Sequence, residues 1–106
     1  MSAPRFQALS VKRVSPEAAE AVAITFAIPE SDRARFTFEP GQFLTLRATI
    51  DGQDVRRTYS ISSPRSRLAR DGELEIGIRP VEGGVFSNWA AQAIKVGDAL
   101  QVMPPD

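Results

Sequence analysis

The residues best able to do chemistry lie in one short string, Arg57-Thr58-Tyr59-Ser60. This string belongs to a segment of alternating residues in which Arg57 and Tyr59 share a face with Val55 and Ile61. A cation and a phenol therefore interrupt an otherwise apolar row. One interpretation is a strand that leaves the core at its end. The other is an aromatic wall beside a fixed cation, which suits a planar, anionic ligand.

A second string, Glu82-Gly83-Gly84-Val85-Phe86-Ser87, directly precedes apolar residues at helical spacing. We expect a short helix here, with Ser87 capping its start. The apolar residues at helical spacing are Phe86, Trp89, Ala90, Ala93 and Ile94. Glycines allow a ligand to approach the backbone closely, and the free N–H groups of a first helical turn favour an anion. The alternative is a plain loop whose two glycines only serve to turn the chain.

A third feature is a run of positive charge without any acid between Arg56 and Arg70. It holds five arginines, Arg56, Arg57, Arg65, Arg67 and Arg70. We interpret Arg65, Arg67 and Arg70 as a solvated face. The alternative is an electropositive rim that attracts phosphate groups.

Composition excludes several classes of chemistry. The chain has 106 residues, with 13 basic and 13 acidic side chains and a net charge of zero, which disfavours nucleic-acid binding. It has no cysteine and no histidine, so thiolate or imidazole metal sites, disulfides and a histidine base are excluded, and no metal site is expected. No apolar run reaches the roughly 20 residues that span a bilayer. We expect one soluble, cytoplasmic domain without membrane contact.

Alternation with a period of two residues predicts six short strands that would position these strings. The expected strands are 6–14, 21–28, 43–50, 54–62, 73–79 and 98–103. Asp51-Gly52 predicts a tight hairpin turn, and Pro40-Gly41, Asp71-Gly72 and Gly97-Asp98 mark further turns. Six strands with close turns favour a closed antiparallel barrel, which leaves no edge exposed. The predicted helix would plug one end of this barrel.

The first two strings together resemble the signatures of the ferredoxin–NADP reductase superfamily. Arg57-Thr58-Tyr59-Ser60 is similar to its Arg-x-Tyr-Ser signature, and Gly84-Val85-Phe86-Ser87 to its Gly-x-x-Ser signature before a helix. Pro40-Gly41-Gln42-Phe43 fits ahead of the third strand. The resemblance covers the whole chain and implies an all-β fold, a six-stranded antiparallel Greek-key barrel with one short capping helix. Within the superfamily the motifs resemble the reductase subunits of phenylacetyl-coenzyme A epoxygenases.

The resemblance implies a role for each matching residue. Tyr59 would stack on the flavin ring. Ser60 would hydrogen-bond near flavin N5, as the side chain that touches the reacting edge, and Thr58 would also bind the cofactor. Arg57 would bind the flavin phosphates. The remaining cofactor-binding residues would be Ile78 and Arg79 along the ribityl chain, and Gly84, Val85, Phe86 and Ser87 at the start of the helix. Trp89 would pack in the barrel. FAD is expected, with FMN the less favoured cofactor.

The resemblance also implies that residues 1–106 are the FAD-binding barrel domain of a longer reductase, without its NAD(P) and 2Fe–2S domains. In the full-length protein, NAD(P)H would reduce the flavin, and electrons would pass to an iron–sulfur centre and an oxygenase component in the degradation of phenylacetate or another aromatic compound. The isolated domain would be inactive as a reductase. The alternative is a β-barrel that binds a protein or another small ligand and never holds a flavin.

Overall fold

The strands and helices follow the alternating and helical patterns of the sequence closely. In the computed structural model, which describes residues 6–106, six strands and two α-helices lie along the chain. The strands are β1 (Gln7–Pro16), β2 (Val22–Ala27), β3 (Phe43–Ile50), β4 (Gln53–Ser60), β5 (Glu73–Ile78) and β6 (Ala99–Val102). The helices are α1 (Arg65–Asp71) and α2 (Val85–Ala93), with single 3₁₀ turns at Ala18–Glu20 and Glu30–Asp32. All six predicted strands are therefore present.

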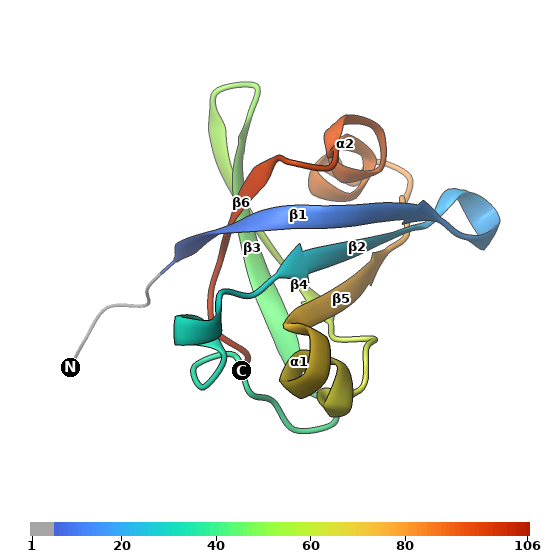
Figure 1. Cartoon of the computed structure of the whole chain (residues 1–106). Helices are drawn as coiled ribbons and strands as arrows, with labels where there is room; N and C mark the ends of the chain where they lie inside the picture. The colour runs from blue at the N-terminus through green and yellow to red at the C-terminus, as the bar shows by residue number, and fades with distance from the viewer. Residues whose placement is uncertain (1–5) are drawn as a thin grey trace.

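The strands form one antiparallel sheet in the order β4-β3-β6-β1-β2-β5. Figure 1 shows this sheet strongly bent, with α2 and α1 at opposite ends of it. In the described part of the chain, the edge strands β4 and β5 meet at one isolated bridge, Ile61 with Ile76. The fold is therefore mostly β, and its two edges approach each other just beyond Ser60.

A tight turn sets the register of the hairpin that carries the Arg-x-Tyr-Ser string. Asp51 and Gly52 both have positive φ, 50° and 78°, as the twist of a two-residue hairpin turn requires. The turn aligns Leu46 with Arg57 and Leu44 with Tyr59 across β3 and β4. The predicted hairpin is confirmed, and it fixes where the string lies.

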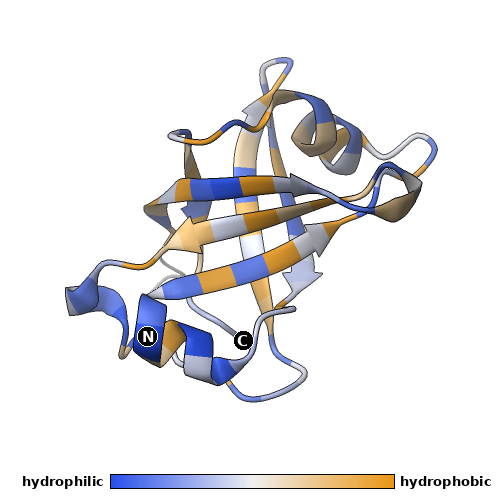
Figure 2. Ribbon diagram, turned by 45° about the vertical axis from the view of Figure 1, so that its right-hand side comes forward, coloured by the Kyte–Doolittle hydropathy of each residue, from blue (hydrophilic) through white to orange (hydrophobic). Residues whose placement is uncertain are grey.

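The core is built from alternate residues of the strands, as the period of two requires. Figure 2 shows apolar and polar residues alternating along β5, whereas β2 is apolar over most of its length and is buried on both faces. The fully buried strand residues include Leu9, Ile24, Phe26, Leu44, Leu46, Leu74, Ile76 and Val102. The apolar face of α2 adds Phe86 and Ala90 to the same core, and Ile94 joins them directly after the helix. Trp89 packs against this core half-buried, as expected.

The structure corrects two expectations about helices. A second helix, α1, occupies the arginine-rich segment, anchored by buried Leu68 and ended by Gly72 in the left-handed conformation. Ser87 does not cap α2, because the cap residue is Gly84 and Ser87 lies within the first turn. The Ser87 hydroxyl instead accepts a hydrogen bond from the Val81 N–H. Neither helix in residues 6–106 is long and apolar enough to cross a membrane.

Candidate functional site

Three separate segments of the chain converge on a cavity of about 180 Å³. Strand β4, the loop after β5 and the first turn of α2 each contribute to its lining. The lining residues are Arg57, Thr58, Tyr59, Arg79, Val81, Gly84, Phe86 and Ser87. Most of the predicted cofactor residues therefore gather at one place, although they come from positions up to 30 residues apart.

Three predicted residues lie outside this lining. Ser60 is exposed at the end of β4, where it pairs with Phe43 of β3. Ile78 is fully buried in the core, so its side chain is closed off from any ligand. Val85 is exposed at the first position of α2. Val81, in contrast, lines the cavity although it belongs to neither signature string; its position between Arg79 and Gly84 was the available signal.

Larger cavities exist, but their chemistry is different. Two hollows of about 500 and 490 Å³ lie along α1 and share Phe38, Arg65 and Ser66 in their linings. Neither is lined by any residue of the two signature strings. We place the candidate site at the smaller cavity because cations, a phenol and a helix start meet there.

The Tyr59 ring forms one wall of the cavity. It lies 5.8 Å from the Phe86 ring, centroid to centroid, at an interplanar angle of 39°. Phe86 is buried and itself packs edge-on against Trp89, so the phenol rests on a fixed aromatic support. Burial raises the pKa of the Tyr59 phenol above its ordinary value, and the charge of Arg57 opposes part of this rise. The phenol therefore stays neutral at physiological pH.

Arg57 stands out among the five arginines between positions 56 and 70. Arg56 pairs with Asp54, Arg65 with Glu39, Arg67 with Glu73 and Glu75, and Arg70 with Asp71. Within residues 6–106, Arg57 has no carboxylate partner and donates instead to the carbonyl oxygen of Arg56 at 2.6 Å. Arg79, also at the cavity, forms no ion pair with the described residues either. Two uncompensated cations thus face one hollow, which is what an anionic ligand requires.

The pairing of the other arginines corrects the interpretation of this charge run. Arg65 and Arg70 are exposed, as expected for a solvated face, but only 20% of the Arg67 side chain is exposed. All three have acidic partners, so they do not form an electropositive rim. The positive charge available to a ligand in this stretch is concentrated at Arg57.

The turn that begins α2 is packed so tightly that it requires a glycine at position 84. A Cβ atom added to Gly84 would lie 2.5 Å from the Val81 side chain and 2.6 Å from the Ser87 hydroxyl. Asn88 closes the same loop by donating from its amide to the carbonyl oxygens of Val81 and Gly84. The first-turn N–H groups of α2 have no acceptor within the helix, and the helix dipole makes this end favourable for negative charge.

The fold is that of the FAD-binding domains of reductases. The chain belongs to the oxidoreductase FAD-binding domain family, whose model matches residues 8–106. This result confirms the resemblance to ferredoxin reductases that the two signature strings indicated.

Two curated relatives give the sequence comparison. The chain is 44% identical to one of the subunits of 1,2-phenylacetyl-CoA epoxidase from Escherichia coli strain K12, over 94% of this chain and 27% of that protein. It is 38% identical to the ferredoxin reductase component of 3-ketosteroid-9-alpha-monooxygenase from Rhodococcus rhodochrous, over 92% of this chain and 27% of that protein. The chain therefore spans about a quarter of the length of these relatives.

Solved structures share the fold. A ferredoxin NADP⁺ reductase from Neisseria gonorrhoeae with bound FAD and NADP superposes with a TM-score of 0.77 and 19% identity, over 98% of this chain and 39% of that one. Phthalate dioxygenase reductase superposes with a TM-score of 0.74 and 22% identity, over 95% of this chain and 30% of that one.

Proposed function

We propose that this chain binds FAD as the flavin domain of an NAD(P)H-dependent reductase that supplies electrons to an oxygenase. The observation that carries this proposal is the meeting of two uncompensated cations, Arg57 and Arg79, with the Tyr59 ring and the start of α2 at one cavity. The names of the two curated relatives support an oxygenase as the final acceptor, and the epoxidase relative favours phenylacetyl-CoA chemistry.

The residues present fit a flavin dinucleotide. Arg57, Arg79 and the N–H groups at the start of α2 supply positive charge and donors for a diphosphate. Tyr59 supplies a supported aromatic face for the ring, and the Ser60 hydroxyl, exposed at the end of β4, is free to donate to a ring nitrogen. Bound FAD would supply the chemistry itself, accepting a hydride and releasing electrons singly. Because the Ile78 side chain is buried, we assign it to packing behind the site.

The same proposal includes two features of the larger molecule. We assign this chain to a longer reductase in which a nicotinamide domain and a 2Fe–2S domain complete the electron path, because the curated relatives are about four times its length. We also propose that the sheet closes into a Greek-key barrel. Two contacts between its edges support this closure: the bridge between Ile61 and Ile76, and the hydrogen bond from the Ser62 N–H to the Glu75 carbonyl at 2.8 Å.

The test is FAD binding by the purified chain and by two arginine variants. The wild type should bind FAD and quench its fluorescence through Tyr59. Arg57→Ala should weaken binding by about 10- to 100-fold, the effect of losing one charge-assisted contact. Arg56→Ala is the matched control, because Arg56 is the adjacent arginine and already pairs with Asp54, so its binding should stay near that of the wild type. A wild type that binds no FAD would favour a ligand- or protein-binding module instead.

A further inference from the structure

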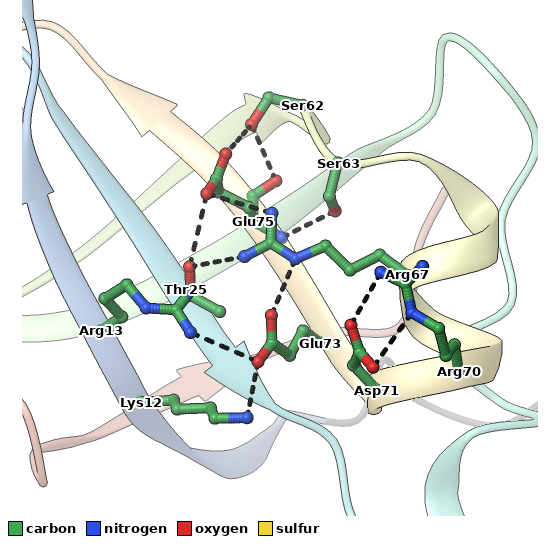
Figure 3. Close-up of polar contacts among 10 residues, drawn as sticks. All are labelled: Lys12, Arg13, Thr25, Ser62, Ser63, Arg67, Arg70, Asp71, Glu73 and Glu75. Atoms are coloured by element: carbon green, nitrogen blue, oxygen red, sulfur yellow. Dashed lines mark hydrogen bonds and ion pairs between the residues drawn. The ribbon is translucent and has the colours of Figure 1, made fainter.

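The polar residues buried in this fold are concentrated behind the end of β4. Four polar residues are buried in the described chain, Thr25, Ser63, Glu73 and Ser87, and three of them belong to one hydrogen-bonded cluster. We call this cluster the α1–β5 network (Figure 3); its members are Thr25, Ser62, Ser63, Arg67, Glu73 and Glu75. Lys12 and Arg13 of β1 also donate to Glu73, at its Oε2 atom.

Arg67 is the centre of this network. Its guanidinium reaches from α1 to three side chains on two strands. It donates to Glu73 of β5 at 2.7 Å, to Glu75 of β5 at 3.3 Å and to the Thr25 hydroxyl of β2 at 3.3 Å. Its hydrogen bond with Glu73 raises the pKa of Arg67, so the cation is permanent. One side chain thereby joins the helix to the edge of the sheet.

The network continues into the segment that follows Ser60. The Ser62 N–H donates to the Glu75 carbonyl at 2.8 Å, and the Glu75 N–H donates to the Ser63 hydroxyl at 2.9 Å. The Ser62 hydroxyl also contacts the Glu75 carboxylate at 3.4 Å. Glu75 is thus bound to Arg67 on one side and to the residues after β4 on the other, as Figure 3 shows.

This arrangement costs desolvation that an apolar contact would avoid. Burying charged groups is expensive, and well-packed apolar residues of similar size are often equally stabilising. A network of fixed donors and acceptors, however, specifies one geometry. Here the geometry specified is the path of the chain two residues after Ser60, where the edge strands meet.

We propose that Arg67 is a positioning residue, which acts through Glu75 to fix the end of β4 and so the orientation of Tyr59 and Ser60 toward a bound flavin. This inference rests on the proposed function for its flavin part only. Its structural part, the fixing of Ser62 and Ser63 on Glu75 by Arg67, is a property of the chain without any ligand.

The experiment compares three variants of the full chain. Arg67→Met removes the charge and keeps the bulk of the side chain. Arg67→Lys keeps the charge but cannot reproduce the planar fork that reaches three partners. Arg70→Met is the matched control, because Arg70 lies on the same helix and loses the same charge, yet pairs only with its exposed neighbour Asp71.

The first readout is amide hydrogen exchange without flavin. In Arg67→Met the N–H groups of Ser62 and Glu75 should exchange about tenfold faster relative to the core amide of Ile24, while Arg70→Met should match the wild type. Equal exchange in Arg67→Met and wild type would overturn the proposal. If Arg67→Met does not fold, Arg67→Lys replaces it with the same expected exchange at Ser62 and Glu75, because lysine cannot hold Glu73, Glu75 and Thr25 together.

The second readout is the visible spectrum and fluorescence of bound FAD. Arg67→Met and Arg67→Lys should shift the flavin band and reduce the quenching by Tyr59, even though the lysine restores most of the thermal stability. A spectrum identical to that of the wild type in both would contradict a positioning role and leave Arg67 purely stabilising. If the wild type itself binds no FAD, the proposed function fails, while the exchange measurement still decides the role of Arg67.

Discussion

The Tyr59 ring on β4 packs against the Phe86 ring on α2, with centroids 5.8 Å apart at 39°. This contact joins two strings that are 27 positions apart and makes the strand and the helix one surface. Because Phe86 is buried and packs edge-on against Trp89, the helix sets the tilt of the phenol. The candidate ring platform therefore depends on Phe86, which lines the cavity, and on Trp89, which lies outside the lining.

Replacing Phe86 by leucine should reduce both the stability of the fold and the quenching of bound flavin. We expect Phe86→Leu to reduce the free energy of unfolding by about 1 kcal/mol, the range of an aromatic pair, and also to reduce quenching of bound FAD because Tyr59 loses its support. Phe36→Leu is the control, since Phe36 is equally buried but lies outside the cavity lining. Urea unfolding and FAD titration measure the two effects. Equal FAD binding in both variants would contradict the supporting role of Phe86.

Adding one methyl group at Gly84 should disturb the start of α2. The new Cβ would overlap the Val81 side chain and the Ser87 hydroxyl, so the loop must shift, at a cost of about 1–3 kcal/mol. FAD affinity should fall with it. Gly77→Ala provides the comparison, because its nearest neighbour would be 3.7 Å away, an ordinary contact, and stability should change little. Thermal unfolding and FAD titration of both variants test the requirement for glycine at position 84.

Acid should weaken the fold through Glu73. Its hydrogen bond from Lys12, followed by that from Arg67, lowers the pKa of the Glu73 carboxyl from the ordinary 4.5 to about 2. A carboxyl with a depressed pKa stabilises the fold above its unfolded-state pKa, and this contribution is lost as the pH falls from about 4.5 to about 2. The loss is at most about 3 kcal/mol.

Urea unfolding between pH 7 and pH 2.5 measures this loss. The Glu73→Gln variant, which cannot titrate, should be less stable at pH 7 and show a flatter dependence on pH in the acid range. A wild-type slope equal to that of Glu73→Gln would mean that other carboxyls cause the acid sensitivity.

Removing the Ser60 hydroxyl should affect reduction more than binding. In the longer reductase that we propose, Ser60→Ala should slow reduction of the flavin by NAD(P)H about fivefold, as expected for one hydrogen bond of about 1 kcal/mol at the reacting edge. FAD affinity should change by less than this factor. Stopped-flow absorbance measures the reduction step, with Ser10→Ala at an exposed position of β1 as the control. An unchanged reduction rate would remove Ser60 from the reacting edge.

The sequence predicts the sheet well because strand formation here is governed by alternation and turn residues. The six strands and the Asp51-Gly52 hairpin follow from these local patterns, and the family match supports the assignment of the two signature strings. Helix α1 was missed because it spans only seven residues and buries a single apolar side chain, Leu68. The predicted cap at Ser87 was wrong because Gly84 begins the helix one turn earlier.

Long-range polar contacts could not be predicted from local patterns. Arg67 belongs to a run of arginines that is typical of a solvated face, yet it bonds to Thr25, which is 42 positions away. The sequence likewise does not show which of these arginines has no carboxylate partner, because partners such as Glu39 of Arg65 are distant along the chain. The candidate site could therefore be recognised in the sequence as two motifs. Only the fold shows that Arg57 is unpaired in the described part of the chain while the neighbouring arginines are neutralised.

The neutralisation of Arg56, Arg65, Arg67 and Arg70 by nearby carboxylates also bears on how a ligand arrives. Charges that cancel locally produce little field at a distance, and physiological salt screens what remains within about 8 Å. An incoming anion is therefore not steered by this stretch from far away, and the charges of Arg57 and Arg79, unpaired within residues 6–106, attract it only close to the cavity. The rate of encounter should consequently vary little with ionic strength, whereas the lifetime of the complex should shorten as salt is added.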